Sequence, residues 1–341
     1  MAAHTRVQMS PTDSLDFLIR SFQVSRMIRL VADLAVADKI TPEGHVKISE
    51  LAATCSVLPG PLLRILRALA AFGIFSVNAD GIVSHSLTSL RLRSDAPQSL
   101  RDAARFFAAP GSWKAWGELD AALSGDVPHQ VAWNASRFDY LRDHPAEARQ
   151  YDAFMAGFPV NRHSAVAAAY DFSNAKLVAD IGGGNGSGLS KILVRHPTPR
   201  GIVFDRADVV EAIPDSTRLD GRIEVQGGSF FDRVPSEADV YLLVTVLHDW
   251  SDDDCARILR VVRNCMPSDA RLLIVEQILE PDPAIGNPML YLVDIQMMAM
   301  FGTGRERTEA EFAEILSACG FRMLRLISTR SPYSIVEAAP S

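Results

Sequence analysis

The spacing of hydrophobic positions predicts a helical first part of the chain. From residue 13 to about residue 96, apolar residues recur every three or four positions in segments 17–40, 48–57 and 60–75, which indicates three helices. Two short apolar runs joined by Asn-Ala-Asp-Gly lie within 73–86 and predict a hairpin. Three helices and a hairpin are the elements of a winged helix, so we expect a winged helix in the N-terminal domain.

Many winged helices bind DNA, but the charge of this one argues against that function. The helix that would enter the major groove, residues 61–72, offers only Arg64 and Arg67 among leucines and an isoleucine. The whole chain carries 34 basic and 41 acidic residues, a net charge of −7, whereas nucleic-acid binders need a basic surface. We therefore expect this helix in a core or in the interface of a homodimer, with no nucleic acid as partner.

The middle of the chain, residues 98–165, also follows a helical pattern. It contains three of the four tryptophans, and residues 138–158 carry a stripe of aromatic residues and methionine. Such a stripe is usually core packing, and the alternative is one wall of a pocket for an aromatic substrate. Both interpretations stay open at this point.

From about residue 172 the pattern changes to short apolar strands that alternate with helices. This alternation is typical of an α/β fold with a doubly wound, mostly parallel sheet covered by helices on both faces. We therefore predict a winged-helix domain, linking helices that contribute to a pocket, and a catalytic α/β domain. Their expected bounds are 1–98, 99–168 and 169–341, and the expected strands are 176–181, 200–205, 222–228, 239–247, 270–278, 321–329 and 333–339.

Composition adds few constraints beyond an ordinary globular protein. Of 341 residues, 48% are hydrophobic and 22% are charged. The four cysteines lie far apart without a Cys-x-x-Cys spacing, which favours free thiols in a reducing compartment over disulfides or a zinc site. The N-terminus lacks an apolar signal core, and no apolar stretch reaches membrane-spanning length. We expect a cytoplasmic protein with no membrane partner and no metal.

A glycine-rich loop, Asp-Ile-Gly-Gly-Gly-Asn-Gly at 180–186, joins the first strand of the sheet to the following helix. Dinucleotide-binding folds carry Gly-x-Gly-x-x-Gly/Ala at this point. Counted from Gly182, the last position of that fingerprint falls on Ser187. Counted from Gly184, it falls on Leu189. The loop therefore lacks the dinucleotide fingerprint, which disfavours a nicotinamide dehydrogenase.

Two acids near this loop favour a cofactor with a positive charge. Asp180 closes the first strand, where it would repel a pyrophosphate but suits the ammonium and sulfonium of S-adenosylmethionine. Asp205 ends the second strand, where a carboxylate can accept hydrogen bonds from both ribose hydroxyls. The loop and the two acids together predict an S-adenosylmethionine site, and a purely structural strand–helix turn is the alternative.

A histidine follows the strand expected at 239–247. Ligands of open α/β sheets bind outside the carboxyl ends of the strands, so the imidazole of His248 should face the reacting methyl group. A phenol has a pKa near 10, and an imidazole with a pKa of about 6.5 is a suitable general base for it. Glu276, at the end of the next strand, and Glu306, before the last helix, are candidates to orient the imidazole. A satisfied core histidine is the alternative.

Four motifs in fixed order, "DIGGGNG", "LHDWSD", "VEQIL" and "GRERTEAEF", resemble those of the plant-type small-molecule O-methyltransferases and their bacterial relatives. That family includes caffeic acid, flavonoid and N-acetylserotonin methyltransferases. The resemblance covers nearly the whole chain and implies a Rossmann-like class I methyltransferase domain behind an N-terminal dimerisation domain. "LHDW" with the later "ERT" is its most specific part.

The resemblance also implies roles for individual residues. It makes His248 the catalytic base, places Glu276 and Glu306 on either side of it, and puts Asp249 near the acceptor hydroxyl. Gly182 and Gly184 match the methionine end of the cofactor site, Asp205 the ribose-binding acid and Phe230 a residue that packs on adenine.

Two positions depart from the family pattern, and both concern the cofactor. Ser229 stands where an acid is usual, and Val244 stands where many members have a lysine. The methionine-rich segment 289–301 lies where the family builds its acceptor pocket, although core packing is nearly as good an explanation for any one residue. The candidate pocket residues are Met155, Met297, Met298 and Phe301.

The leading hypothesis is methyl transfer from S-adenosylmethionine to an aromatic hydroxyl by a homodimer. Transfer to nitrogen or carbon, and a relative that has lost methylation, are the enzymatic alternatives. A ligand-sensing regulator built on the winged helix is a further alternative from another class.

Overall fold

A computed structural model describes residues 11–157 and 162–341. The chain forms two compact units, each described here by itself. The first comprises the residues up to 113 and the segment from 146 to 158, and the second comprises 114–145 and 159–341. The segment predicted as linking helices, 99–168, therefore contributes to both units.

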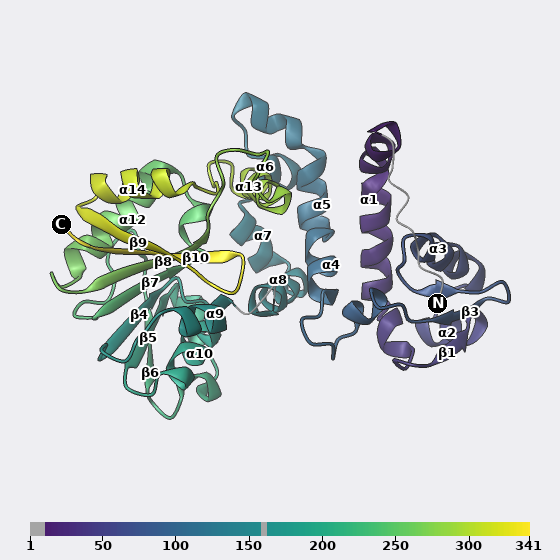
Figure 1. The fold of residues 1–341 in the computed structure, drawn as a ribbon, viewed down its shortest axis with the longest axis horizontal. Helices are drawn as coiled ribbons and strands as arrows, with labels where there is room; N and C mark the ends of the chain where they lie inside the picture. Colours follow the sequence, from purple (N-terminus) through teal and green to yellow (C-terminus); the bar gives the residue numbers. More distant parts are fainter. Residues whose placement is uncertain (1–10, 158–161) are drawn as a thin grey trace. The chain divides into compact units, whose positions relative to one another are not determined.

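The first unit contains helices, of which α1, α2 and α3 are labelled in Figure 1. It also contains a small antiparallel sheet with strand order β1-β3-β2. The apolar pattern of the third predicted helix is explained by burial, since Leu62, Leu66 and Leu69 lie in the core of this unit. One long helix was expected over 17–40, but α1 ends at Asp33 because Ala35 adopts a left-handed backbone with φ 51°. The elements are α1 (Pro11–Asp33), β1 (His45–Lys47), α2 (Ile48–Cys55), α3 (Pro59–Ala71), β2 (Ser76–Val77), β3 (Ile82–Ser84), α4 (Arg101–Phe107) and most of α8 (Pro145–Gly157).

The second unit is built on a seven-stranded sheet with strand order β6-β5-β4-β7-β8-β10-β9 (Figure 1). Strands β6 to β8 in that order are parallel, and β10 runs antiparallel to both of its neighbours. The prediction of a mostly parallel, Rossmann-like sheet is confirmed. The strands are β4 (Leu177–Ile181), β5 (Arg200–Asp205), β6 (Ile223–Gly227), β7 (Val240–Val244), β8 (Arg271–Gln277), β9 (Phe321–Ser328) and β10 (Tyr333–Pro340).

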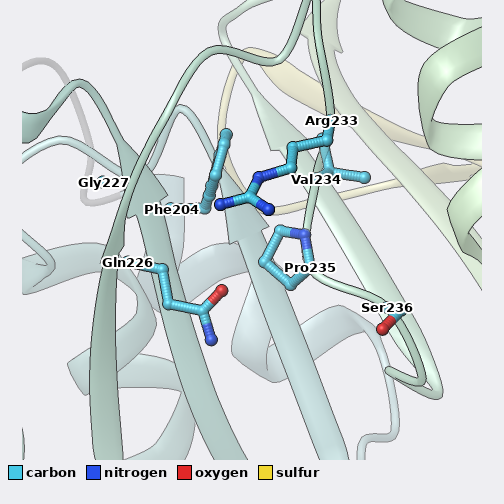
Figure 2. Close-up of a pocket in the computed structure, with 7 residues that line it drawn as sticks. All are labelled: Phe204, Gln226, Gly227, Arg233, Val234, Pro235 and Ser236. Carbon is cyan, nitrogen blue, oxygen red and sulfur yellow. The ribbon is translucent and has the colours of Figure 1, made fainter.

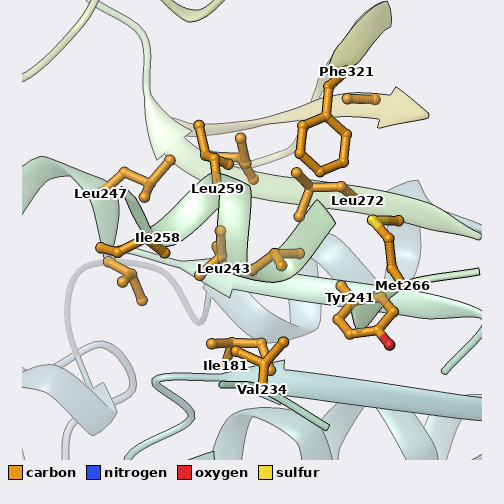
Figure 3. Close-up of a cluster of buried hydrophobic side chains, with 14 of the residues drawn as sticks. Ile181, Val234, Tyr241, Leu243, Leu247, Ile258, Leu259, Met266, Leu272 and Phe321 are labelled. Atoms are coloured by element: carbon orange, nitrogen blue, oxygen red, sulfur yellow. The ribbon is translucent and has the colours of Figure 1, made fainter. Parts of the chain in front are cut away.

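Helices cover both faces of this sheet, and each face has its own apolar core. Alternate residues of a strand point to opposite faces, so Val178 packs against α9 and α10 whereas Ala179 packs on the face covered by α12 and α14. Figure 3 shows the second core, with Ile258 and Leu259 of α12 over Leu243 of β7. The covering helices are α9 (Arg162–Ala169), α10 (Ser187–Arg195), α11 (Ala207–Glu211), α12 (Asp252–Cys265) and α14 (Glu309–Ala318).

A separate group of helices in this unit packs around α13 (Pro288–Phe301). Trp116 donates its indole N–H to Gln296 at 2.6 Å, and Phe138 lies 5.5 Å from Phe301 between ring centroids. The other members are α5 (Pro110–Gly117), which spans the boundary between the units, α6 (Pro128–Trp133) and α7 (Arg137–Asp143). Among the described residues, no helix is long and apolar enough to cross a membrane. The four cysteines are free thiols.

The strand expected over 239–247 is shorter than its apolar run predicts. β7 ends at Val244, and Thr245 adopts a positive φ of 53°, which takes the chain out of the sheet. A short 3-10 turn, Leu247–Asp249, then carries the histidine, and α12 begins at Asp252. His248 therefore lies on a tight turn beyond the carboxyl end of the strand and not at the strand end itself.

Candidate active site

The turn that carries His248 is held by a buried carboxylate from the neighbouring strand. One oxygen of Glu276, Oε1, accepts hydrogen bonds from the backbone N–H groups of Val246 and Leu247, each at 3.0 Å. Glu276 lies near the end of β8 and is 1% exposed. It therefore satisfies two N–H groups that the strand has released, as an N-cap residue does for a helix.

The imidazole of His248 is surrounded by three carboxylates. Its Nδ1 lies 2.8 Å from Glu306 Oε1 and 3.6 Å from Glu276 Oε2. Its Nε2 lies 3.4 Å from Asp249 Oδ1, and the side chain is 12% exposed. Of the three, only Glu306 is at hydrogen-bond distance. The structure thus brings all four predicted catalytic residues together and distinguishes the two glutamates, because Glu306 binds the ring while Glu276 mainly binds the turn.

This environment changes the proton affinity of the whole cluster. Burial alone would lower the pKa of His248, but the charges of Glu276, Glu306 and Asp249 outweigh it and raise the pKa to about 10. Burial raises the pKa of Glu276 to about 7 and that of Asp249 to about 6, while the imidazolium opposes both increases. The imidazole is therefore a much stronger base here than in water.

The same atoms have the spacing of a metal-ligand set. Ligand atoms of His248, Glu276 and Glu306 all lie within 4.8 Å of one another. Nδ1 would have to give up its proton and its hydrogen bond to Glu306 to bind a cation. The Oε2 atoms of Glu276 and Glu306 are buried without a hydrogen-bond partner. Either oxygen could therefore accept a proton instead of binding a cation.

The glycine-rich loop between β4 and α10 leaves room for a ligand. Gly182, Gly184 and Gly186 have φ values of 74°, 57° and 73°, which favour glycine over other residues. A Cβ on Gly184 would meet nothing within 4 Å, so this part of the loop borders open space. Gly184 also donates its N–H to Asp205 Oδ2 at 2.8 Å, which fixes the second predicted acid beside the loop.

Asp180 lies beneath this loop and is 2% exposed. Its Oδ1 atom is buried without a hydrogen-bond partner, and its Oδ2 atom would lie 2.9 Å from a Cβ on Gly183. Burial and the charge of Asp205 raise the pKa of Asp180 to about 7, although Arg162 opposes this. A buried acid without a partner is costly in an apolar environment, and the ammonium or sulfonium of S-adenosylmethionine would relieve that cost. The residues present therefore fit this cofactor.

The two departures from the family pattern take up different positions. Val244, at the end of β7, is 7% exposed and packs in the core of one sheet face. Its apolar side chain cannot make the polar contact that a lysine would make at this position. Ser229 accepts a hydrogen bond from the N–H of Phe231 at 3.2 Å and so stabilises its own turn. The ring of Phe230 would lie 3.9 Å from a Cβ on Gly182, which places this aromatic side chain next to the glycine loop.

The candidate pocket residues are divided between the two units. Met155 lies on α8 of the first unit, and Met297, Met298 and Phe301 lie on α13 of the second. All four are partly buried. One turn before Met297, Asp294 accepts the N–H of Glu306 at 2.8 Å, so α13 runs beside the histidine cluster.

A hollow of about 430 Å³ opens elsewhere on this unit, beside the ends of β5 and β6. Figure 2 shows Gln226 and Arg233 reaching toward it from different segments. Its lining residues are Phe204, Gln226, Gly227, Arg233, Val234, Pro235 and Ser236, and none of the predicted site residues is among them.

Two residues of the histidine cluster were missed by sequence reasoning. Arg307 is 1% exposed and donates to the carbonyls of Leu247 and Trp250, and Gly304 packs against the carbonyl of His248. The only signal in the sequence was their presence in the "GRERT" motif, from which Glu306 alone was selected.

Comparison with known proteins agrees with this geometry. A family model described as an O-methyltransferase domain matches residues 116–322. Phenazine O-methyltransferase PhzM of Lysobacter antibioticus is 35% identical over 347 residues, which is 100% of both chains. The chain belongs to the O-methyltransferase family. The motifs, the fold and the enzyme class that the sequence resemblance implied are thereby confirmed.

Solved structures extend the comparison to the cofactor. The crystal structure of LaPhzM matches with a TM-score of 0.89 at 34% identity, covering 98% of this chain and 100% of that one. CalO1, a methyltransferase in calicheamicin biosynthesis solved in its SAH-bound form, matches with a TM-score of 0.81 at 30% identity and covers 98% of this chain and 100% of that one. The family is S-adenosylmethionine-dependent, as the glycine loop and its two acids predict.

Proposed function

We propose that this O-methyltransferase methylates the hydroxyl group of a small aromatic acceptor and that His248 is its general base. The observation that carries the proposal is the hydrogen bond of 2.8 Å between His248 Nδ1 and Glu306 Oε1. When Nδ1 keeps its proton for this bond, Nε2 is the nitrogen that can accept one. A carboxylate in this position also stabilises the imidazolium that forms, as in other histidine-based catalysts.

The raised pKa of His248 suits a phenol as acceptor. A phenol has a pKa near 10, close to the pKa of about 10 that the carboxylates give the imidazole. Proton transfer between groups of similar pKa is nearly balanced, so the hydroxyl can become nucleophilic without a large penalty. The free enzyme must lose one proton first, and turnover of an ordinary phenol should therefore rise with pH between about 7 and 10.

The cofactor contacts follow from the loop geometry. S-adenosylmethionine supplies a methyl carbon on a sulfonium that is already an activated leaving group. Gly182 and Gly184 would allow its methionine end to approach the backbone, and the buried carboxylate of Asp180 would face its positive charge. Asp205 has its two oxygens on the N–H groups of Gly184 and Arg206, and the remaining lone pairs suit the ribose hydroxyls. Phe230 would pack on adenine, with Ser229 and Val244 offering little additional attraction.

The acceptor would lie between His248 and the methionines of α13. Met297, Met298 and Phe301 are partly buried residues of a helix that runs beside the cluster, and methionine adapts to flat, polarisable ligands. We propose that these three side chains line the acceptor pocket. Asp249, next to Nε2, would orient the acceptor hydroxyl.

We also propose that the enzyme works as a homodimer joined through its first unit. Helix α1 exposes a row of large apolar side chains, including Leu18 and Ile19, each 64% exposed. Such a surface is unusual on a monomer and marks an interface.

Sedimentation velocity should give a dimer, and Ile19→Arg should give a monomer. A wild-type monomer at micromolar concentration would refute the dimer. The other exposed apolar residues of α1 are Leu15, Phe17, Phe22 and Leu30.

The experiment that tests the function compares His248→Ala with His45→Ala, an exposed histidine on β1 that serves as the control. Labelled S-adenosylmethionine and a panel of catechols, flavonoids and polycyclic phenols identify an acceptor first. On that acceptor His248→Ala should lose about 10²- to 10⁴-fold in kcat and keep its affinity for S-adenosylhomocysteine. On a nitrophenol already ionised at the assay pH the loss should be much smaller. Equal losses on both acceptors, or no loss on either, would remove His248 from the base role.

A further inference from the structure

Arg307 is a buried cation whose hydrogen-bonding capacity is fully used. Its side chain is 1% exposed, and it is first among the largest fully buried side chains of the described residues. An arginine has five N–H donors in a rigid fork. Here Nε and Nη2 donate to Asp252 Oδ1 at 2.9 and 2.8 Å, Nη1 donates to two carbonyls, and Nη2 donates to a third. Burying a charge without such partners costs free energy. These five hydrogen bonds therefore explain how the guanidinium can be buried, and their acceptors show which segments it connects.

Two of those carbonyls lie on either side of the catalytic turn. Nη1 donates to the carbonyl of Leu247 at 2.9 Å, and Nη2 donates to that of Trp250 at 2.8 Å. These residues bracket His248 and Asp249, so one guanidinium fixes both ends of the turn. The third carbonyl, that of Arg305, belongs to the segment from which Glu306 projects. Arg307 thus connects the element that carries the base to the element that carries its carboxylate.

Gly304 adds a second contact between the same two elements. The N–H of Arg305 donates to the carbonyl of His248 at 2.8 Å. A Cβ on Gly304 would lie 2.8 Å from that carbonyl oxygen and 3.1 Å from the backbone of Asp249. Both atoms belong to the backbone, which cannot rotate away, so only glycine allows this approach.

We propose that Arg307, with Gly304, is a positioning residue that sets the distance between the imidazole of His248 and the carboxylate of Glu306. The inference rests on the proposed function only where it predicts an effect on turnover. Its geometric part, that Arg307 holds the imidazole against Glu306, can be measured without an acceptor. Since its own side chain is buried, Arg307 acts through the turn and not by touching the substrate.

The test uses Arg307→Lys, which keeps the positive charge opposite Asp252 but has three donors on a point charge and cannot span the carbonyls of Leu247 and Trp250. The matched control is Arg257→Lys, an exposed arginine of α12. The first readout is the titration of His248 by NMR in the whole enzyme without acceptor. We expect His248 to titrate at least one pH unit lower in Arg307→Lys than in wild type, because Glu306 moves away from Nδ1. Unchanged titration would overturn the inference whatever the reaction proves to be.

The second readout is kcat on the acceptor. A displacement of about 1 Å can cost roughly 10²-fold in rate, so kcat should fall by about 10- to 100-fold while affinity for S-adenosylhomocysteine changes less than about twofold. The double variant with His248→Ala should be no slower than His248→Ala alone, since a misplaced base cannot be lost twice. Additive losses would show a general structural role and overturn the inference. A normal kcat in His248→Ala would instead refute the proposed base, and the titration would still decide about Arg307.

Gly304→Ala provides a second variant in case Arg307→Lys does not fold. Its control is Gly60→Ala on α3, where a Cβ would meet nothing within 4 Å. Gly304→Ala should lower both the pKa of His248 and the kcat, as Arg307→Lys does, although Arg307 is intact. Wild-type behaviour of Gly304→Ala would contradict the proposed contact between the two elements.

Discussion

Glu306→Gln is the sharpest single perturbation of the proposed base. The substitution removes one charge but keeps an oxygen 2.8 Å from Nδ1 of His248. The surrounding carboxylates raise the pKa of His248 from 6.5 to about 10 against the opposing effect of burial. At about 1.4 kcal/mol per pH unit, this increase corresponds to roughly 5 kcal/mol of net attraction for the imidazolium. Glu306 contributes both a charge and a hydrogen bond to it, so its loss should lower the pKa of His248 by about 1 to 2 pH units.

The sign of the accompanying stability effect follows from linkage. The folded pKa of His248 lies above its unfolded value, so the attraction stabilises the fold fully below about pH 6.5 and is lost as the pH rises to about 10. Glu306→Gln should therefore reduce the free energy of unfolding more at pH 6 than at pH 10. The difference between the two reductions should be about 1.4 to 2.8 kcal/mol for a decrease of 1 to 2 pH units.

Two assays measure this prediction, and Glu314→Gln on the exposed side of α14 is the control. NMR titration of His248 gives its pKa directly, and the acid limb of the profile of kcat/KM against pH should move to lower pH by the same amount. The plateau of that profile should fall, because a weaker base drives proton transfer less. If His248 titrates at the same pH in Glu306→Gln and in wild type, the carboxylate does not control the imidazole and the reasoning fails.

Two further substitutions test the charges around the site. Asp180→Asn removes an acid whose folded pKa, about 7, lies above its ordinary value, so ionisation costs stability increasingly from about pH 3.8 to pH 7. Urea unfolding of the free enzyme should show an advantage for the variant that grows over this range to at most about 4 kcal/mol, whereas calorimetry should show weaker binding of S-adenosylmethionine; an advantage that does not change with pH would contradict this account. Asp252→Asn removes the charge opposite the buried Arg307 and should cost about 1 to 2 kcal/mol in urea unfolding, less than a fully buried pair because Asp252 is 60% exposed. The neighbouring Asp253→Asn is the control, as it shares the first turn of α12, and an equal cost in both variants would assign the effect to the helix dipole.

The sequence predicts the sheet well because burial and local geometry agree there. The apolar runs of β4, β5 and β8 lie within the predicted strands, and the glycine loop joins β4 to α10 as expected. The exceptions arise where a distant group competes with the local pattern. The run 239–247 continues to favour a strand, but Glu276 of β8 captures the N–H groups of Val246 and Leu247, and the chain leaves the sheet after Val244.

The composition of the histidine cluster was also accessible from sequence, but its internal geometry was not. His248 and Glu276 could be assigned to one site because strand ends of a parallel sheet meet at one edge. Glu306 could be added only through its place before the last helix and the family resemblance of the segment "GRERTEAEF". The burial of Arg307 could not be inferred, since arginine is almost never fully buried without partners, and three of its acceptors here are backbone carbonyls beside the carboxylate of Asp252. Every residue has a backbone carbonyl, so no sequence motif can predict which carbonyls accept these hydrogen bonds.

The different tasks of the two glutamates explain why the site needs both. Glu276 Oε1 is committed to two backbone N–H groups, and its Oε2 remains 3.6 Å from Nδ1. Glu306 Oε1 contacts the imidazole of His248 and does not hold the backbone of the turn. Its carboxylate can therefore move with the imidazole as the ring gains and loses a proton. A carboxylate that also held the turn could not do so without displacing His248. Shortening Glu276 to Asp should therefore disorder the turn, whereas shortening Glu306 to Asp should leave the turn intact and weaken only the imidazolium.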